Sequence, residues 1–177
     1  MKKQKALFLD RDGVINIDHG YVSKIDNFVF TEGIFELLHL FIHKGYILFI
    51  ITNQSGIGRG YYSLEDFQVL TQYMLDIFKE KNIHIQEVQY CPHAPEENCD
   101  CRKPKTGMID NILKKHPIDL ENSWLIGDKQ SDIDLALNSH ISHSIAISNT
   151  PLHHASYSFD SMQSCKDFIE TDPTVVL

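Results

Sequence analysis

Short, unbroken apolar runs recur along the chain and are separated by longer stretches of mixed polarity. The first run, Ala6-Leu7-Phe8-Leu9, ends at an acidic cluster, and a second run over residues 46–51 ends at Thr52. Because neither run alternates with polar residues, we expect parallel strands that are covered on both faces. Strands are predicted on this basis over residues 6–9, 46–51, 83–90, 124–126 and 141–147.

Between the predicted strands, apolar residues recur at the spacing of a helix. Ile34, Leu37 and Phe41, for example, lie on one helical face, as expected for a helix that packs against a sheet. Cap residues and proline then set the limits of the helices. Helices are predicted from residue 34 to a C-terminal cap at Gly45, from an N-cap at Ser63 to Asn82, and over residues 107–116, 133–138 and 159–169.

Strands that alternate with amphipathic helices predict an α/β fold with an open, mainly parallel sheet and right-handed crossovers. The chain has 177 residues, so we expect one domain over residues 1–177. Ligands of such sheets bind outside the carboxyl ends of the strands. Polar clusters fall at three predicted strand ends, over residues 10–12, 52–55 and 128–132, and we expect them to converge on one crevice.

The composition narrows the class of protein. The chain is 42% hydrophobic and 23% charged, which is typical of a globular protein. Its formal net charge of −8 disfavours nonspecific nucleic-acid binding, which depends on clustered Lys and Arg. The longest apolar run, residues 47–51, is far shorter than the roughly 20 residues that span a bilayer. We therefore expect a cytoplasmic protein without a membrane or nucleic-acid partner, and we expect it to be monomeric.

Two carboxylates, Asp10 and Asp12, follow the first predicted strand. Asp10 can attack phosphorus as a nucleophile if a cation offsets the repulsion between two anions, and magnesium, which prefers oxygen ligands, suits that role. Asp12 can protonate the departing oxygen and later deprotonate the attacking water. The alternative is a solvated acidic turn, which is less in keeping with a position directly after a buried strand.

Other strand-end residues extend this chemistry. Asp128 is the expected further magnesium ligand, and Asp132, four residues on, is either another ligand or a helix-terminal carboxylate. Thr52 and Ser55, with the amides around Asn53, can donate hydrogen bonds to phosphoryl oxygens. A dinucleotide-binding or P-loop motif is not found in the sequence.

Three cysteines and one histidine crowd into one segment of the chain. Cys91, His93, Cys99 and Cys101 match the Cys₃His set of a structural zinc site, and a closed set of four ligands leaves no position for a substrate. We therefore expect zinc to rigidify a loop over residues 91–103. Reduced, metal-free cysteines are the alternative.

A basic cluster, Arg102-Lys103-Pro104-Lys105, comes directly after the predicted zinc ligands. Lys103 is expected to stabilise the charge that develops on the transferred phosphoryl group. Arg102 can form two parallel hydrogen bonds and suits a second substrate anion or hydroxyl groups. A solvated basic turn is the alternative.

The ordered motifs resemble those of haloacid-dehalogenase-type phosphatases. The resemblance rests on Asp10-Arg11-Asp12-Gly13, Thr52-Asn53, Lys103 and Gly127-Asp128, which together span most of the chain. It implies a Rossmann-like, three-layer fold. It also implies a magnesium-dependent phosphoric monoester hydrolase with catalytic roles for Asp10, Asp12, Thr52 and Lys103.

Within that superfamily the chain is most similar to the heptose bisphosphate phosphatases. This similarity is carried by Asp18-His19-Gly20-Tyr21, by residues 52–60, by Cys91-Pro92-His93, by residues 99–104 and by Gly127-Asp128-Lys129. It implies a compact enzyme without a large cap domain, which hydrolyses the 7-phosphate of D-glycero-D-manno-heptose 1,7-bisphosphate and leaves heptose 1-phosphate, a precursor of nucleotide-activated heptose and lipopolysaccharide. It implies magnesium on Asp10, Asp12 and Asp128, and substrate contacts from Asp18, His19, Gly20, Tyr21, Thr52, Asn53, Gln54, Ser55, Arg102, Lys103 and Lys129.

Three alternatives stay open on the sequence alone. The histidinol-phosphate phosphatases share the zinc loop and the Cys-x-Cys-Arg-Lys-Pro motif, and Thr106 stands where the heptose enzymes often have proline. A phosphomutase or phosphotransferase would pass the phosphate of Asp10 to another acceptor. A non-catalytic module could bind a phosphorylated metabolite in the same crevice, although it would not need Asp10 and Asp12.

Overall fold

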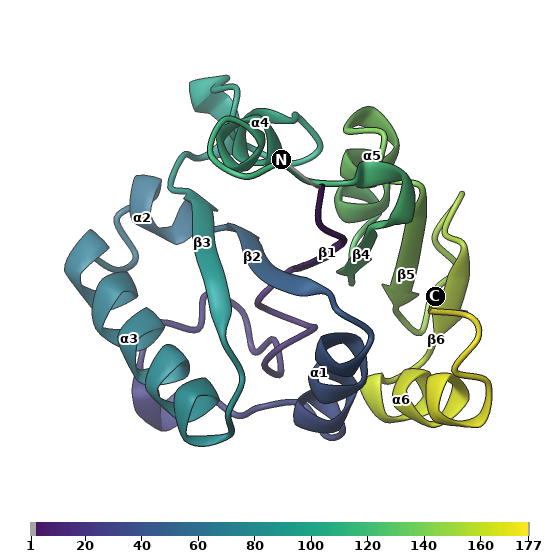
Figure 1. The fold of residues 1–177 in the computed structure, drawn as a ribbon. Helices are drawn as coiled ribbons and strands as arrows, with labels where there is room; N and C mark the ends of the chain where they lie inside the picture. The colour runs from purple at the N-terminus through teal and green to yellow at the C-terminus, as the bar shows by residue number, and fades with distance from the viewer. Residues whose placement is uncertain (1–2, 177) are drawn as a thin grey trace.

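A computed structural model describes residues 3–176, and the ends of the predicted domain, residues 1–2 and 177, lie outside the described residues. The centre of the molecule is one six-stranded sheet with the order β3-β2-β1-β4-β5-β6 (Figure 1). Each pair of neighbouring strands is parallel. The strands are β1 (Ala6–Leu9), β2 (Ile47–Asn53), β3 (Ile85–Cys91), β4 (Trp124–Gly127), β5 (His143–Ile147) and β6 (Tyr157–Phe159).

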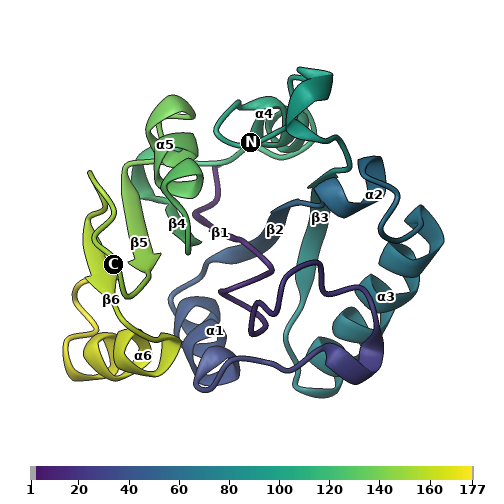
Figure 2. The ribbon, with the colours of Figure 1, turned by 180° about the vertical axis from the view of Figure 1, so that it is seen from behind.

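Helices cover both faces of this sheet, which gives the expected three layers. In Figure 1, α4 and α5 lie above the sheet, whereas α1 and α6 lie below it. Seen from behind, the connection between β1 and α1 reaches a position beside α3 (Figure 2). The helices are α1 (Ile34–His43), α2 (Ser55–Gly58), α3 (Leu64–Glu80), α4 (Gly107–Leu113), α5 (Gln130–Asn138) and α6 (Met162–Thr171).

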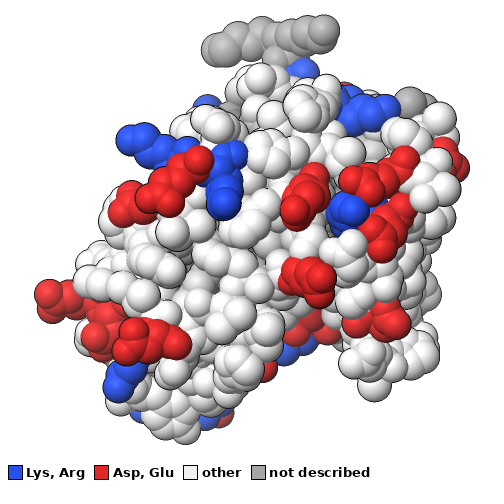
Figure 3. All heavy atoms as spheres, turned by 90° about the horizontal axis from the view of Figure 1, so that it is seen from below, with Lys and Arg blue, Asp and Glu red and all other residues white. Residues whose placement is uncertain are grey.

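No separate cap domain interrupts the described residues. The long connection from residue 10 to residue 33 contains one short 3₁₀ helix, Ile25–Asn27. Acidic side chains predominate over basic ones on the face that Figure 3 shows. Among residues 3–176, we find no helix with the length and apolar character required to cross a membrane.

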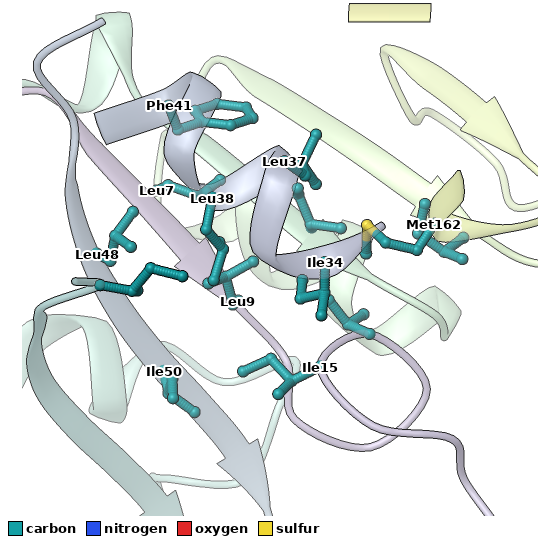
Figure 4. Close-up of a cluster of buried hydrophobic side chains, with 14 of the residues drawn as sticks. Leu7, Leu9, Ile15, Ile34, Leu37, Leu38, Phe41, Leu48, Ile50 and Met162 are labelled. Atoms are coloured by element: carbon teal, nitrogen blue, oxygen red, sulfur yellow. The ribbon is translucent and has the colours of Figure 1, made fainter. Parts of the chain in front are cut away.

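Residues of each strand alternate between two cores, one on each side of the sheet. Leu7 and Leu9 point into the core beneath α1 and α6, while Ala6 and Phe8 belong to the core beneath α4 and α5. Figure 4 shows the first core, in which α1 packs its apolar face on β1 and β2. All four residues of β1 are fully buried, as expected for a strand covered on both sides.

The sheet places two strand ends at a topological switch point. Strand β1 lies between β2 and β4, with Leu9 opposite both Ile50 and Ile126. The chain proceeds outward from β1 in one direction through β2 and β3, and in the other through β4, β5 and β6. Ligands of open parallel sheets bind where the order reverses, so the crevice lies beyond the ends of β1 and β4.

Each predicted strand and helix is present, and the predicted caps at Gly45 and Ser63 are confirmed. Gly45 has the left-handed backbone of a C-terminal cap (φ +84°), and Ser63 forms a capping box with Asp66. The helix predicted over residues 107–116 ends earlier, at Leu113, and the turn that follows leads to Pro117, which has no N–H group to continue a helix. Two short elements, α2 and the edge strand β6, were not predicted, since four or three residues carry almost no periodic signal.

Candidate active site

Three carboxylates meet at the switch point. Asp10 directly follows β1, Asp128 directly follows β4, and Asp132 lies in the first turn of α5. Carboxylate oxygens of these three residues lie within 4.8 Å of one another, although the first and last residues are 122 positions apart in the chain. We call Asp10, Asp128 and Asp132 the acidic cluster.

Two glycines make this close approach possible. Gly13 has a left-handed backbone (φ +87°), and a Cβ atom there would lie 2.3 Å from Asp128 Oδ2. A Cβ atom on Gly127 would lie 2.1 Å from the Cβ atom of Asp132. The glycines of both sequence motifs are therefore needed because the acidic side chains occupy the space that any larger residue would fill.

Lys103 lies inside the acidic cluster and compensates part of its charge. Its Nζ atom is 2.9 Å from Asp10 Oδ1 and 2.6 Å from Asp132 Oδ1, and it donates to the carbonyl oxygen of Ile51 at 3.0 Å. Burial alone would lower the pKa of Lys103, but the carboxylates of Asp10 and Asp132 raise it above the usual value. Lys103 is therefore a permanent buried cation whose three donors all have acceptors.

One lysine does not neutralise three carboxylates. Burial raises the pKa of Asp10, an increase that Lys103 opposes and Asp132 reinforces. Burial, followed by the charge of Asp10, raises the pKa of Asp128 to about 8. Asp128 Oδ1 is also buried without a hydrogen-bond partner among the described residues. Carboxylate oxygens that are neither neutralised nor hydrogen-bonded by the protein are suited to bind a hard divalent cation such as magnesium.

The carboxylate of Asp12 is not part of the acidic cluster. It accepts hydrogen bonds from Arg11 at 2.8 and 3.2 Å, from Asn16 at 3.0 Å and from Gln54 at 3.0 Å. It still lines the small cavity, of about 40 Å³, that contains Asp10 and Lys103. Asp12 is thus placed to exchange a proton at that cavity, while any contact with a cation in the acidic cluster must come from another of its atoms.

A larger cleft of about 280 Å³ adjoins the small cavity, and the two share Asp12, Asn53, Lys129 and Ser131. Most residues for which the sequence implied a substrate contact line this cleft: Asp18, Gly20, Tyr21, Asn53, Gln54, Ser55, Arg102 and Lys129. Arg102 Nη1 is buried and has no hydrogen-bond partner among the described residues. A guanidinium group with an unused donor is suited to an anion in the cleft.

Lys129 lines the cleft beside two acidic residues. Its Nζ atom is 3.4 Å from Asp18 Oδ2 and 3.9 Å from Asp128 Oδ2. Burial would lower the pKa of Lys129, but Asp128, Asp10 and Asp18 together raise it. Asp18 also accepts a hydrogen bond from the amide of Gly20 at 2.8 Å, which shapes the turn that leads to Tyr21.

Two residues with an implied substrate contact lie elsewhere. His19 is exposed and does not line the cleft, and Thr52 is buried beneath it, where its hydroxyl oxygen accepts a hydrogen bond from Gln54 at 2.8 Å. The amide nitrogen of Gln54 donates to both Thr52 and Asp12, so its two donors are used within the protein. Asn53 Oδ1 accepts from the backbone amide of Lys103 at 3.1 Å and joins the end of β2 to the basic cluster.

The cysteine segment forms a second cluster of donors, which we call the thiol cluster: Cys91, His93, Cys99 and Cys101. Its sulfur atoms are 2.8 to 3.5 Å apart, and His93 Nδ1 is 3.3 Å from Cys101 Sγ. Burial tends to raise the pKa of Cys99, but hydrogen bonds from Cys91 and Cys101 lower it to about 7. Four convergent soft donors without a disulfide are compatible with tetrahedral zinc.

Backbone hydrogen bonds attach the thiol cluster to the site. The amide of Gln54 donates to the carbonyl oxygen of Cys91 at 2.8 Å, and that of Gly58 donates to the carbonyl oxygen of Pro92 at 2.8 Å. Arg102 and Lys103 follow the last cysteine directly in the chain. The loop over residues 91–103 therefore delivers Arg102 to the cleft and Lys103 to the small cavity.

Sequence reasoning missed several residues of the site. The sequence leaves Asp132 as a helix-terminal carboxylate or a metal ligand and does not indicate its ion pair with Lys103. It also accepts hydrogen bonds from the amides of Asp128 and Lys129, as a carboxylate in a first helical turn does. Tyr62 and Ser131 line the cleft, and no motif marked either of them.

The chain is similar to known phosphatases over most of its length. A model of the family described as polynucleotide kinase 3 phosphatase matches residues 9–174. A Helicobacter pylori protein (strain ATCC 700392 / 26695) named D-glycero-beta-D-manno-heptose-1,7-bisphosphate 7-phosphatase is 50% identical over 171 residues, which cover 96% of each chain. A Campylobacter jejuni protein named D-glycero-alpha-D-manno-heptose-1,7-bisphosphate 7-phosphatase is 52% identical over 139 residues, 78% of this chain and 80% of that protein.

The fold is also that of a solved structure. The D,D-heptose 1,7-bisphosphate phosphatase from B. bronchiseptica, a structure complexed with magnesium and phosphate, superposes with a TM-score of 0.82 at 22% identity. The superposition covers 95% of this chain and 99% of the other. The predicted superfamily fold is thereby confirmed.

Proposed function

Because this chain belongs to the D-glycero-D-manno-heptose 1,7-bisphosphate 7-phosphatase family of the haloacid dehalogenase superfamily, we propose that it removes the 7-phosphate through a phospho-Asp10 intermediate and leaves heptose 1-phosphate. The observation that carries the mechanism is the position of Asp10, buried beside Lys103 in a cavity that adjoins the arginine-lined cleft. The residue roles below belong to this proposal.

Asp10, Asp12 and Asp128 would hold the magnesium ion. We propose that Asp12 would contact the magnesium ion through its main-chain carbonyl oxygen, because its carboxylate already accepts hydrogen bonds from Arg11 and Gln54. The unpartnered Asp128 Oδ1 and the raised pKa of Asp10 and Asp128 support a cation at this position. When bound, the ion supplies the positive charge that allows an anionic carboxylate to approach a phosphate group.

In the first step a carboxylate oxygen of Asp10 bonds to the 7-phosphorus. The bond from phosphorus to the sugar oxygen breaks as Asp12 gives its proton to that oxygen. Lys103 neutralises charge on the transferred group, and the hydroxyl of Thr52 donates a hydrogen bond to it. In the second step Asp12 takes a proton from water, the water oxygen bonds to phosphorus, and the bond to Asp10 breaks. Free phosphate leaves, with Asp10 ionised and Asp12 protonated again.

The remainder of a bisphosphate substrate would lie in the larger cleft. Arg102 and Lys129 offer positive charge there, which suits the 1-phosphate. Histidinol phosphate has an ammonium group in place of a second phosphate, so the same two cations favour the heptose substrate. Asp18, Gly20, Tyr21 and Asn53 would contact the sugar hydroxyl groups.

A small metabolite fits this site better than a polynucleotide does. The two cavities measure about 40 and 280 Å³. The net charge of −8 and the predominance of acidic side chains in Figure 3 would repel the phosphates of a nucleic acid. We propose a monomer in which residues 1–177 act as one catalytic domain.

We further propose that Cys91, His93, Cys99 and Cys101 hold zinc and that the zinc is structural. The four donors fill its coordination sphere and leave no position for a substrate. Thiols that stay reduced to bind metal fit a reducing compartment, which supports a cytoplasmic location.

The test is phosphate release from both anomers of heptose 1,7-bisphosphate and from histidinol phosphate, at matched concentrations with magnesium. We expect rapid release from at least one anomer, slow release from histidinol phosphate, and loss of activity in a chelator that added magnesium restores. Preference for histidinol phosphate would overturn the substrate, and release that is indifferent to magnesium would overturn the mechanism.

A further inference from the structure

Tyr62 has no role in the mechanism above, although it is buried at the edge of the substrate cleft. Its hydroxyl donates a hydrogen bond to Gln54 Oε1 at 2.5 Å. Gln54 Nε2 in turn donates to Asp12 Oδ2 at 3.0 Å and to Thr52 Oγ1 at 2.8 Å. One tyrosine is thereby linked, through one amide, to both the proposed proton donor and the proposed phosphate-binding hydroxyl.

We infer that Tyr62 is a positioning residue, which acts through Gln54 to hold Asp12 and Thr52 in their reactive arrangement. The inference rests on the proposed roles of these two residues. Tyr62 lines the cleft, and the hydrogen bond of its hydroxyl goes to Gln54 and not to a reacting group.

The direction of each hydrogen bond follows from its partners. Asp12 Oδ2 accepts from Gln54 Nε2, so the NH₂ group of Gln54 faces Asp12 and the amide oxygen faces Tyr62. Tyr62 must then be the donor. Burial raises the pKa of Tyr62 to about 12, so the phenol keeps its proton. If the Gln54 amide flipped, its oxygen would face the carboxylate of Asp12. The Tyr62 hydroxyl would then lose Gln54 Oε1 as its acceptor, so Tyr62 disfavours the flipped orientation.

The same amide orients Thr52. The hydroxyl oxygen of Thr52 accepts one hydrogen of the Gln54 amide, so its own hydrogen is free to point elsewhere. In the proposed mechanism that hydrogen is donated to a phosphoryl oxygen. The Gln54 side chain is almost fully buried, and both of its NH donors are used within the protein.

The backbone is shaped to bring Tyr62 to Gln54. A Cβ atom on Gly56 would lie 2.1 Å from Tyr62 Cε1, so the ring packs where only glycine leaves room. The intervening segment turns back on itself, with the amide of Tyr61 donating to the carbonyl oxygen of Gly56 at 2.8 Å. Close packing and a buried, directional hydrogen bond are what a positioning contact requires.

The test uses two aryl phosphates of similar shape, phenyl phosphate and 4-nitrophenyl phosphate, with magnesium present. Phenolate needs a proton as it departs, whereas 4-nitrophenolate, the anion of a far more acidic phenol, does not. The ratio kcat/KM reports the step in which Asp12 acts as an acid. Since a positioned general acid contributes about 10²–10⁴-fold, we expect Tyr62→Phe to lose about tenfold with phenyl phosphate and less than about twofold with 4-nitrophenyl phosphate, with KM little changed.

A double-mutant cycle tests whether Tyr62 acts through Gln54. We expect Gln54→Met to show the same selective loss, and Tyr62→Phe to cost nothing further in that background. Gln54→Met also carries the test if Tyr62→Phe does not fold. The matched control is Tyr46→Phe, which removes the hydroxyl of another buried tyrosine. Tyr46 lies just before β2, at the amino-terminal ends of the strands, and its substitution should leave both kcat/KM values unchanged.

Equal losses with the two aryl phosphates, no loss in Tyr62→Phe, or additive losses in the double variant would each overturn the inference. The proposed function is tested separately by the wild-type protein. A wild type that hydrolyses both aryl phosphates but not heptose 1,7-bisphosphate would refute the proposed substrate, and the Tyr62 test would still stand.

Discussion

The acidic cluster and the thiol cluster are both sets of metal-binding side chains, yet they are built in opposite ways. The thiol cluster comes from eleven consecutive positions of one loop, whereas the acidic cluster joins the ends of β1 and β4 and the first turn of α5. The four donors of the thiol cluster can saturate an ion. The acidic cluster is paired with one cation, Lys103, and an oxygen of Asp128 has no hydrogen-bond partner among residues 3–176.

This difference distinguishes a structural metal site from a catalytic one. A closed set of soft donors stabilises a loop and does nothing else, because no coordination position is left. An open set of oxygen donors can bind a cation that also contacts a phosphate. The two clusters are nonetheless coupled, since Lys103 follows Cys101 by two positions and pairs with Asp10. The following changes are ordered from the largest expected effect to the smallest.

Removal of the nucleophile should abolish activity without disturbing the thiol cluster. We expect Asp10→Asn to lose at least about 10⁴-fold in kcat, the scale seen when a nucleophile is removed from an enzyme. Zinc content and the thermal unfolding midpoint should stay near those of the wild type. The control is Asp76→Asn, an exposed carboxylate on α3 that should keep full activity. Residual turnover in Asp10→Asn close to that of the wild type would refute the nucleophile.

Gly13→Ala should disturb the geometry of the acidic cluster. Its Cβ atom would lie 2.3 Å from Asp128 Oδ2, and displacement of a reacting group by about 1 Å can cost about 10²-fold in rate. Gly45→Ala is the matched control, because Gly45 has a similar backbone (φ +84° against +87°) and a Cβ atom there would meet nothing within 4 Å. Both variants should lose about 1–2 kcal/mol of stability from backbone strain. Titration with magnesium and steady-state kinetics should then distinguish them, and equal kinetics would contradict the close approach.

A broken thiol cluster should lower activity indirectly. We expect Cys99→Ser to lose zinc and to lose about 10–100-fold in kcat, because the loop no longer aligns Lys103 and Arg102. Cys165→Ala removes the one cysteine outside the cluster, in the core beneath α6, and should retain both zinc and activity. Metal analysis and phosphate release on the same samples provide the check. Full activity in a zinc-free Cys99→Ser protein would show that the two clusters are independent.

The pH dependence of stability should reveal the uncompensated charge. Burial and the charge of Asp10 raise the pKa of Asp128 from the ordinary value of 3.8 to about 8 in the folded protein without magnesium. Between these values the folded state binds more protons than the unfolded state, so the free energy of unfolding falls as pH rises through this window. Asp128→Asn cannot ionise and should unfold at a higher temperature than wild type at pH 8 without magnesium, by about 2–4 °C for each kcal/mol. Dialysis must keep zinc while removing magnesium, and a lower midpoint in Asp128→Asn would contradict the account.

The sequence predicted the thiol cluster and the strand-end carboxylates for different reasons. Cys91 to Cys101 are close in the chain, so chain proximity alone indicated a common ligand. Asp10 and Asp128 are far apart, and their convergence followed from the rule that parallel strands end at one edge of the sheet. The resemblance to a known family implied the individual substrate contacts, and most of the residues concerned line one cleft.

What the sequence could not predict depends on side-chain geometry. The ion pair between Lys103 and Asp132 requires a loop and a helix to meet, and no spacing rule relates residues 29 positions apart. The orientation of the Asp12 carboxylate is fixed by hydrogen bonds from Arg11, Asn16 and Gln54. Edge strand β6 has three residues, and only its pairing with β5 identifies it as a strand.

The measurement that tests the central claim most directly is a ³¹P NMR time course of heptose 1,7-bisphosphate with the protein and magnesium. The account predicts that the resonance of the 7-phosphate disappears, that inorganic phosphate replaces it, and that the resonance of the anomeric 1-phosphate persists. Loss of the anomeric resonance, or an unchanged spectrum from a folded protein with bound zinc, would contradict it.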